Sequence, residues 1–467
     1  MHEVVNSVHR GMVATPWGDS GALREKRLPP GPGRPREEVL ANQRERLYGA
    51  MVASVAKRGY LATTVNDLVE ISGVSSRTFY DLYPDKKACF LATLQAIIEA
   101  AAAYAVQSVS ELDPQAPARV GAPDGSGQEV KDWEQQARIG FDAFAEMIAL
   151  QPAAARLAFL ETYAAGPEAI ALIENAASGF EWLARQMLEQ SPERAGMPAE
   201  MITAHIGAQQ EIARTRLRRG EEAELPGLMD EIWELLLSYR PPPEPLRLTG
   251  RAPRFGAETI DAHDHAERAL RAFAVVASEE GYVNTTVEAV LKRAQMSATT
   301  FYANFAGKED ATLAAIDSAC SQIMAAVLPA FRRAPDWPHG VRAGFGALCN
   351  FLASRPAMAQ LIAVEVYAAG STAVERRSET LQPLEKFIGE GFERGPGAPV
   401  LATEAIAGAT FTLVYKRLRD SGPASLPTLA PLLTYITLSP FIGAEEACRV
   451  ANGDGRGRAL AAPNIPG

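Results

Sequence analysis

Cysteine is scarce in this sequence of 467 residues. The four cysteines, Cys89, Cys320, Cys349 and Cys448, lie far apart and form no Cys-x-x-Cys pair. This spacing predicts neither a zinc site nor a disulfide framework, so we expect no metal and no other cofactor, and a reducing compartment. The N-terminus, MHEVVNSVHRGMVATPW, lacks the apolar run of a secretory signal. We therefore expect a cytoplasmic protein.

Motifs of catalysis and membrane insertion are missing as well. The sequence assembles no nucleophile, metal or phosphate-loop motif, so we expect no enzyme and no catalytic residues. GDSG at 18–21 resembles the nucleophile segment of trypsin-like proteases, but only His2 and His9 precede it as bases. The uncharged stretch 421–444 is long enough to span a membrane, yet four prolines interrupt it. We expect a buried helix there and no membrane partner.

Basic charge is also limited, because the formal net charge is −10. This balance argues against a protein coated in nucleic acid, although binding depends on where the charges cluster. One such cluster runs from Arg24 to Arg58, where nine basic residues accompany four acidic ones. A local contact with nucleic acid is therefore compatible with the composition.

The sequence contains a long internal repeat. Aligned without a gap, residues 59–95 and 281–317 are identical at 12 of 37 positions. Downstream, PAAARLAFLETYAAG at 152–166 matches PAMAQLIAVEVYAAG at 356–370, and a proline-rich joint lies at 240–256. Two whole modules were therefore duplicated, not a single motif. Apolar residues such as Leu47, Met51 and Val55 recur at helical spacing, so we expect an all-α chain.

Each copy contains the pattern of two short helices joined by a sharp turn. Thr64 and Thr286 are suited to cap the first of these helices. In the first copy that helix, VNDLVEIS, ends at Gly73, which tolerates a left-handed conformation, and Ser75 caps the next helix. This arrangement predicts a helix-turn-helix motif, whose second helix enters the major groove of DNA.

The second helix of the first copy has an inner and an outer side. Phe79 lies on the inner side, and Tyr80 is placed to present its hydroxyl to a phosphate. Ser76, Arg77 and Asp81 occupy the turn and the outer face. Arginine offers paired donors to a guanine edge, so Arg77 is the first candidate for reading sequence.

Specific motifs in this region resemble a known family. The order is Gly-Tyr, Thr-Thr-Val, Gly-Val-Ser, Thr-Phe-Tyr and a downstream lysine, where Lys86 and Lys87 begin a helix suited to phosphate binding. This order and spacing resemble the DNA-binding domain of the tetracycline-repressor (TetR/AcrR) family. The resemblance implies all-helical dimers in which three N-terminal helices bind double-stranded DNA. It also implies a C-terminal domain that dimerises and holds a small-molecule effector.

The resemblance implies a set of DNA contacts in each copy. Phosphate contacts would come from Thr64, Tyr80, Lys86, Thr286, Tyr302 and Lys308. Base edges would face Ser76, Arg77 and Asp81 in one copy and Ala298, Thr299 and Ala303 in the other, with Ser75, Thr78, Ser297, Thr300 and Lys87 beside them. Because the two sets differ chemically, the two half-sites should differ. Arg34 and Arg36 of GRPR form either a minor-groove arm or a solvated disordered tail.

The second copy departs from the family pattern. Gln295 replaces the turn glycine, and Ala306 replaces Pro84. Glu279 and Glu280 stand where the first copy has a lysine and an arginine, which weakens attraction to phosphate if these positions face DNA.

Together the repeat and the resemblance predict seven segments. They are a disordered basic arm at 1–39, a helix-turn-helix domain at 40–100, a regulatory domain at 101–239, a linker at 240–260, a second helix-turn-helix domain at 261–322, a second regulatory domain at 323–445 and a disordered tail at 446–467. Helices near 201–219, 227–238, 403–418 and 427–442 would form the interface of an intrachain pseudo-dimer. Whether two chains associate further is left open.

Residues of the two regulatory domains suggest an effector site. Glu161 and Glu365 recur amid apolar residues, where a carboxylate is costly unless it is paired. Each forms either a structural ion pair or cap, or an acid for a cationic ligand. Phe159, Tyr163, Tyr367, Trp182 and Trp233 line either that cavity or an ordinary core.

We therefore expect a TetR-type transcription regulator of the repressor kind that reads an asymmetric operator as a single-chain pseudo-dimer and is relieved by an effector. The alternative is a ligand sensor or protein-interaction scaffold whose degenerate second helix-turn-helix no longer binds DNA.

Overall fold

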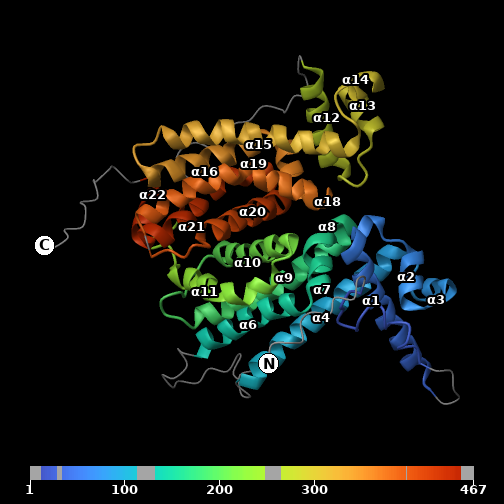
Figure 1. Cartoon of the computed structure of the whole chain (residues 1–467). Helices are drawn as coiled ribbons and strands as arrows, with labels where there is room; N and C mark the ends of the chain where they lie inside the picture. The colour runs from blue at the N-terminus through green and yellow to red at the C-terminus, as the bar shows by residue number, and fades with distance from the viewer. Residues whose placement is uncertain (1–11, 29–33, 113–131, 248–263, 396, 454–467) are drawn as a thin grey trace. The chain divides into compact units, whose positions relative to one another are not determined.

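The computed structural model describes residues 12–28, 34–112, 132–247, 264–395 and 397–453, and within these ranges every regular element is a helix (Figure 1). The predicted all-α class is confirmed. The apolar spacing in the first long helix explains why, because Leu47, Met51 and Val55 are all buried on one side of it. Burial of such a stripe supplies most of a helix's stability in a folded protein.

The first copy contains two groups of helices. The first group, which the sequence predicts to bind DNA and which is called the DNA-binding group, consists of α1 (Arg36–Ala62), α2 (Val65–Ser72) and α3 (Ser76–Leu82), followed by the connecting helix α4 (Lys86–Leu112). The second group, which the sequence predicts to be regulatory and which is called the regulatory group, consists of α6 (Asp132–Leu150), α7 (Pro152–Arg156), the π-helix η2 (Leu157–Glu161), α8 (Thr162–Ala165), α9 (Pro167–Glu189), α10 (Ala199–Arg219), the 3-10 helix η3 (Glu222–Leu228) and α11 (Met229–Ser238).

The second copy repeats this order. Its DNA-binding helices are α12 (His265–Glu280), α13 (Val287–Ala294) and α14 (Ala298–Tyr302), and α15 (Lys308–Arg332) follows. The regulatory helices are α16 (Trp337–Ser354), α17 (Pro356–Gln360), the π-helix η4 (Leu361–Glu365), α18 (Val366–Ala368), α19 (Ser371–Gly389), η5 (Glu390–Glu393), α20 (Ala402–Ser421), η6 (Pro423–Leu429), α21 (Ala430–Ile442) and α22 (Ala444–Ala451). The order of elements confirms two tandem modules.

Both copies turn the same corner inside the regulatory domain. The helix axis bends by 102° between Glu134–Leu150 and Pro152–Ala165, and by 108° between Trp337–Ser354 and Pro356–Ala368. Gln151 and Arg355 leave the helical conformation at the corner, each followed by a proline at the first position of the next helix. A proline is favoured at that position and restricts the residue before it, so the sequence itself places the bend. A π-helix follows each corner.

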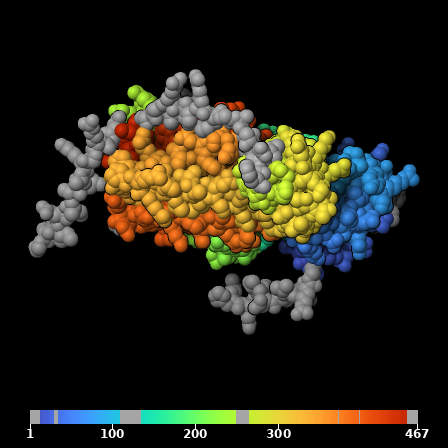
Figure 2. All heavy atoms as spheres, turned by 90° about the horizontal axis from the view of Figure 1, so that it is seen from above, coloured from blue at the N-terminus to red at the C-terminus, as the bar shows by residue number. Residues whose placement is uncertain are grey.

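The chain folds into two compact units. Unit 1 comprises Met1–Ser191, Gln209–Asp230 and Tyr367–Val374, and unit 2 comprises Pro192–Ala208, Glu231–Val366 and Glu375–Gly467. Each unit contains one helix-turn-helix domain with regulatory helices. In unit 2 the yellow side chains of the second DNA-binding domain are continuous with the orange ones of the helices that follow (Figure 2).

The expectation of a disordered arm over 1–39 is wrong for residues 12–28 and 34–39. Leu23 is fully buried in the core of the first DNA-binding domain, and the Trp17 ring lies 5.2 Å from that of Tyr48. The amide of Asn42 also donates to the carbonyl of Lys26 over 3.0 Å. These contacts are long-range and carry no helical period, which is why the sequence did not indicate them. Residues 1–11 and 29–33 lie outside the described residues.

The boundaries of the second half also need correction. The expected disordered tail at 446–467 begins with ordered chain, because α22 extends to Ala451 and buries Ala447, Cys448 and Val450. The first part of the expected linker is packed as well: the backbone N–H of Arg247 donates to Asn452 over 2.8 Å. The rest of that linker, from 248 on, and the tail beyond 453 are not described.

Three helical segments are long and apolar enough to cross a membrane by length and composition, Lys86–Ser108, Lys308–Arg332 and Pro423–Ile442, and two bent helix pairs pass the same test. The last segment falls in the uncharged stretch noted in the sequence. Because 78% of its apolar window is buried inside the fold, it matches the predicted buried helix.

Candidate DNA-binding interface

The first helix-turn-helix is built as the sequence indicates. Thr64 caps α2 through a reciprocal capping box with Asp67, and Gly73 ends that helix in the left-handed conformation, with φ of 64°. Ser75 then caps α3 by accepting from the backbone N–H of Thr78 over 3.1 Å. Phe79 is fully buried and anchors α3 on the domain core. The predicted inner and outer sides of α3 are therefore confirmed.

The outer face of α3 carries the predicted readers. Ser76, Arg77, Tyr80 and Asp81 are all exposed, and the Tyr80 side chain is 58% exposed. Arg77 lies in the first turn of the helix, the part that points into the groove in helix-turn-helix proteins. These residues are free of the core and available to DNA.

The second helix-turn-helix keeps this geometry with other residues. Thr286 caps α13, and Ser297 caps α14 by accepting from the backbone N–H of Thr300 over 3.1 Å. Phe301 is buried and Tyr302 is 56% exposed. Ala298, Thr299 and Ala303 are exposed on the remaining surface. Thus α14 presents small neutral side chains where α3 presents Arg77 and Asp81.

Four predicted contact residues have their hydroxyls engaged within the motif. The Ser75 and Thr78 hydroxyls lie 2.9 Å apart, and so do those of Ser297 and Thr300. These bonds complete the caps of the recognition helices, so the four residues shape the motif. Their contact with DNA stays a prediction.

The side-chain ammonium groups of Lys86 and Lys308 donate hydrogen bonds to backbone carbonyl groups of the same DNA-binding domain. The Lys86 ammonium donates to the carbonyls of Tyr60 and Thr63 over 2.8 Å each and lies 4.2 Å from the centre of the Tyr60 ring. Lys308 repeats this with Tyr282, at 2.7 Å to the carbonyl and 4.1 Å to the ring. Burial lowers the pKa of both lysines. The lysines therefore have a structural task in each module, and their predicted role as phosphate anchors remains untested.

Of the remaining basic candidates, Lys87 and Arg34 are paired with acids, and Arg36 is exposed. The Lys87 ammonium lies 2.6 Å from a carboxylate oxygen of Glu168, which joins the start of α4 to the start of α9. Arg34 pairs with Glu38 over 3.2 Å, and Arg36 is the first residue of α1. Solvent-accessible pairs of this kind are weak and exchange readily, so Lys87 and Arg34 can still meet a phosphate.

The two DNA-binding domains carry ion pairs of opposite polarity between their first two helices. In the first, Arg58 of α1 pairs with Asp67 of α2 over 3.1 Å. In the second, Glu279 of α12 pairs with Arg293 of α13 through both guanidinium nitrogens. The acidic replacement noted in the sequence is therefore partly compensated, because Arg293 stands where the first copy has Ile71.

Two arginines near the first motif escaped the sequence analysis. Arg46 is buried and donates to the carbonyl of Ser72 at the end of α2 over 2.9 Å. Arg24, in the ordered N-terminal segment, lies against the turn, since a Cβ at Gly73 would stand 2.9 Å from its Cγ. Their only sequence signal was the local excess of basic residues.

Glu161 and Glu365 perform the same task in their respective units. A carboxylate oxygen of Glu161 accepts from the backbone N–H of Tyr60 over 2.8 Å, and Glu365 accepts from that of Tyr282 over 2.7 Å. Burial raises the pKa of both carboxyls, although the hydrogen bond from the tyrosine N–H opposes the shift. Of the two alternatives for these glutamates, the structure supports a cap for both.

A cleft in unit 1 brings together three of the predicted ligand residues. Phe159, Glu161 and Tyr367 line it together with Leu160, Arg214, Arg218, Gly370 and Val374. Tyr163 stacks on Tyr367 with ring centres 4.5 Å apart. The cavity volume is about 20 Å³, room for about one water molecule. Trp182 is 59% exposed and does not line this cleft, which corrects its expected place.

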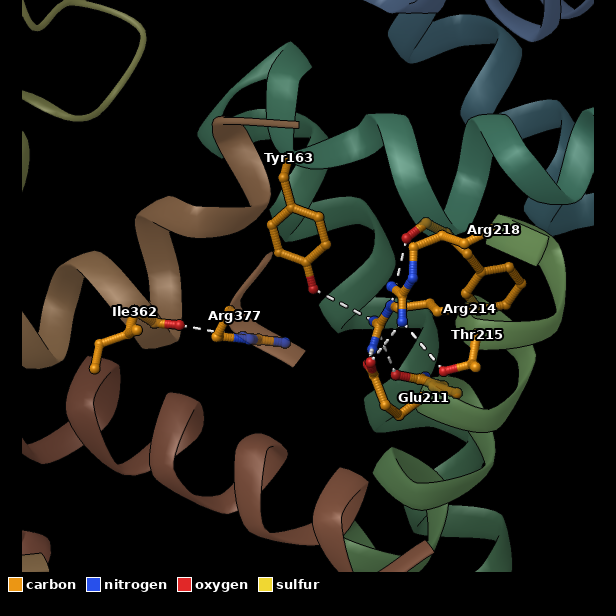
Figure 3. A network of polar contacts seen from close by, with 9 residues as sticks. Tyr163, Glu211, Arg214, Thr215, Arg218, Ile362 and Arg377 are labelled. Atoms are coloured by element: carbon orange, nitrogen blue, oxygen red, sulfur yellow. Dashed lines mark hydrogen bonds and ion pairs between the residues drawn. The ribbon is translucent and has the colours of Figure 1, made fainter. Parts of the chain in front are cut away.

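The arginines of the cleft belong to a polar network that the sequence analysis missed. Glu211 lies between the guanidinium groups of Arg214 and Arg218, at 3.3 Å and 3.0 Å, and the Tyr163 hydroxyl lies 3.4 Å from Arg214 (Figure 3). All three charged side chains are largely buried. The one signal for this network was their spacing of three and four residues along α10. In unit 2, Arg377 is fully buried and donates to the carbonyl of Ile362 over 3.1 Å (Figure 3).

Comparison with known proteins agrees with the geometry. The family model described as bacterial regulatory proteins, tetR family, matches residues 50–93 and again residues 269–315. No curated protein matches the sequence. Among solved structures, the fatty acid degradation regulator FadR from Bacillus halodurans is similar over 39% of this chain and 99% of its own, at 18% identity and a TM-score of 0.36. At this TM-score the similarity supports no structural argument.

Proposed function

Because a tetR-family model matches one segment in each half of the chain, we propose that the protein is a transcription regulator that reads an asymmetric operator with both domains. The observation that carries the proposal is the pair of preserved helix-turn-helix scaffolds with different outer faces. Arg77 and Asp81 are exposed on α3, whereas Thr299 is exposed on α14 and Ala303 directly after it. Different outer faces bind different base sequences.

We propose that one chain supplies both reading heads as a pseudo-dimer. Helices of both copies pack within unit 2, which supports this: a Cβ at Gly207 of α10 would stand 2.2 Å from Thr412 Oγ1 of α20. In the same unit the Tyr239 hydroxyl donates to the carbonyl of Ile436 over 2.9 Å. Helix-turn-helix dimers read half-sites about 34 Å apart. Covalent linkage keeps the two heads at a high effective concentration and lets each diverge.

The proposed regulation is repression in the cytoplasm, relieved by a small-molecule effector. The cleft beside Phe159, Glu161 and Tyr367 supports an effector site in unit 1. Because its cavity has room for about one water molecule, an effector has to displace side chains to enter. Such a change alters DNA affinity only if the effector binds the two conformations unequally.

Selection of DNA by the full chain tests the proposal. Fragmented genomic DNA is incubated with the protein at low salt, and the retained fragments are sequenced. We expect one recurrent site with two unlike halves centred about one helical turn apart. A chain with Arg77→Ala selects the same site with relaxed preference in one half only. The proposal is wrong if no fragment is enriched at low salt, or if the two halves are identical.

A second candidate is a sensor or scaffold whose second DNA-binding domain is degenerate. The observation that favours it is the acidic pair Glu279 and Glu280 at the end of α12. Matched substitutions of the exposed tyrosines separate the two functions. A degenerate second head predicts that Tyr80→Ala abolishes DNA binding while Tyr302→Ala leaves it unchanged. A working second head predicts comparable losses.

A further inference from the structure

Both DNA-binding domains are tied to their regulatory helices by the same hydrogen bond. The acceptor is the last residue of a π-helix, Glu161 of η2 or Glu365 of η4. The donor is the backbone N–H of the tyrosine that follows a glycine with positive φ, Gly59 at 75° or Gly281 at 79°. The bond joins residues 101 positions apart in one module and 83 in the other. It therefore recurs despite the different lengths of the intervening chain.

The glycine explains why that N–H is available. At Gly59 the backbone leaves the helical conformation inside α1, so the next N–H loses its partner one turn back. The carboxylate lies directly beside the glycine, since a Cβ there would stand 3.4 Å from the nearer oxygen of Glu161. Positive φ favours glycine, so the conformation that frees this N–H depends on a glycine at the position.

The same tyrosine is held from its other side. The Tyr60 carbonyl accepts from Lys86, and the Tyr60 ring lies beneath the ammonium of that lysine. Tyr282 and Lys308 repeat both contacts. The tyrosine is thus fixed by the regulatory domain through its N–H and by the connecting helix through its C=O. Both contacts therefore act on one residue, which precedes the threonine that caps the first helix of the helix-turn-helix, Tyr60 before Thr64 in the first copy.

We propose that Glu161 and Glu365 are positioning residues that fix the orientation of each DNA-binding domain on its own regulatory helices. Glu161 also lines the cleft in unit 1, so a molecule that enters the cleft and draws this carboxylate aside releases Tyr60. The consequence for DNA affinity depends on the proposed function as a regulator, whereas the positioning role does not.

A distance measurement on the full chain tests the positioning role. Spin labels are attached to Glu70→Cys on α2 and Ser178→Cys on α9, both exposed positions of unit 1. The four native cysteines are buried and stay unlabelled. We expect Glu161→Ala to broaden the distance distribution relative to the wild-type protein. Glu161→Gln keeps an acceptor for the Tyr60 N–H, so it should restore the narrow distribution.

The matched control is Glu168→Ala, which removes an exposed ion pair between the same two parts of the unit. It should leave the distribution unchanged, because exposed pairs hold little orientation. The inference is overturned if Glu161→Ala leaves the distribution narrow, or if Glu161→Gln broadens it equally.

Hydrogen exchange provides a second readout if Glu161→Ala weakens folding. The Tyr60 amide should exchange about ten times faster in that variant, as loss of one charge-assisted hydrogen bond predicts. Amides in the middle of α6 should keep their wild-type rates, and a general increase there would instead show loss of folding. Equal exchange of the Tyr60 amide in variant and wild type would contradict the bond.

DNA binding by the same variants separates this inference from the proposed function. If Glu161→Ala broadens the distance distribution, only the molecules that keep the wild-type distance should bind the selected DNA. The dissociation constant of the variant should then equal the wild-type value divided by the fraction of such molecules. If Glu161→Ala broadens the distance distribution but the wild-type protein binds no DNA, the proposed function is wrong and the positioning role stands. If the wild-type protein binds DNA but Glu161→Ala leaves the distance distribution unchanged, the positioning role is wrong and the proposed function stands.

Discussion

Gly73 and Gln295 occupy the same position in the two helix-turn-helix turns, and both adopt the left-handed backbone conformation, with φ of 64° and 50°. Gln295 is the one non-glycine residue with positive φ in the described parts of the chain. A residue with a Cβ pays about 1–2 kcal/mol in this conformation. The second turn therefore keeps the geometry of the first at a cost in stability.

Replacing Gln295 by glycine should stabilise the second DNA-binding domain. The gain from relieved strain is about 1–2 kcal/mol, less about 0.4–1 kcal/mol for the added freedom of the unfolded chain. We expect slower hydrogen exchange of the α13 and α14 amides in Gln295→Gly. The converse substitution, Gly73→Ala, should speed exchange in α2 and α3. Equal exchange in Gln295→Gly and wild type would show that the turn is unstrained.

Leu23→Ala should destabilise the first DNA-binding domain although it lies outside the predicted motif. The side chain is fully buried and packs against Gly49 of α1. Truncation of a buried leucine costs about 2–5 kcal/mol. Denaturant unfolding followed by hydrogen exchange in α1–α3 measures this loss. Glu25→Ala, an exposed neighbour, should change stability by less than about 0.5 kcal/mol. A similar result for both variants would mean that residues 12–28 do not contribute to the domain.

The charge of Glu161 should reduce stability at neutral pH. Burial raises the pKa of this carboxyl in the folded protein, so protonation favours the folded state. That stabilisation is present below the unfolded pKa, about 4.3, and is lost as the pH rises through the folded pKa. Glu161→Gln should therefore melt above the wild type at pH 7, and the difference should shrink toward zero near pH 4.

Glu168 is the control for this prediction, because its pKa shifts in the opposite direction from that of Glu161. The hydrogen bond from Lys87 lowers the pKa of Glu168, so its stabilisation is present at neutral pH and lost on acidification. Glu168→Gln should melt at or slightly below the wild type at pH 7. If both variants shift the melting temperature in the same direction across the pH range, local electrostatics does not explain the effect.

The sequence predicts some parts of this molecule well for a physical reason. The caps at Thr64 and Ser75, the turn at Gly73 and the burial of Phe79 all follow from interactions within a few residues. Local chemistry of this kind is visible in a short stretch of sequence. For the same reason the two copies could be aligned and the all-α class predicted.

Other parts depend on contacts between distant residues and were therefore missed. Leu23 reaches the core through a turn-rich segment that has no period to detect. Lys86 matches the family's phosphate anchor, yet an ammonium serves a carbonyl as readily as a phosphate, and here it holds Tyr60. Glu161 was left between two roles because its partner, the Tyr60 N–H, lies 101 residues away. Glu161 also ends a π-helix, and no sequence pattern predicts where a π-helix forms. The contact with Tyr60 could therefore not be inferred from the sequence.

Restoring basic residues at the end of α12 should strengthen DNA binding if the second head faces DNA. In Glu279→Lys with Glu280→Arg, two acidic side chains become basic, as in the first copy. Two added phosphate contacts would steepen the slope of log K against log salt by about 1.8. Loss of the exposed pair with Arg293 should cost less than about 1 kcal/mol. An unchanged slope in a titration between low and moderate salt would place this surface away from DNA.

Arg77 and Tyr80 should affect DNA binding in different ways, although both are exposed on α3. Arg77→Ala should cost about 1–3 kcal/mol on the preferred operator and relax the preference at one base pair. Tyr80→Phe removes a hydroxyl predicted to meet a phosphate, so it should weaken all sequences alike by about 0.5–1.5 kcal/mol. Competition binding against operators with single base changes measures both effects. Tyr302→Phe provides the matched control in the second head, where the same hydroxyl is exposed. If Arg77→Ala weakens every operator equally, Arg77 contacts the backbone, and the asymmetry of the site must arise elsewhere on α3.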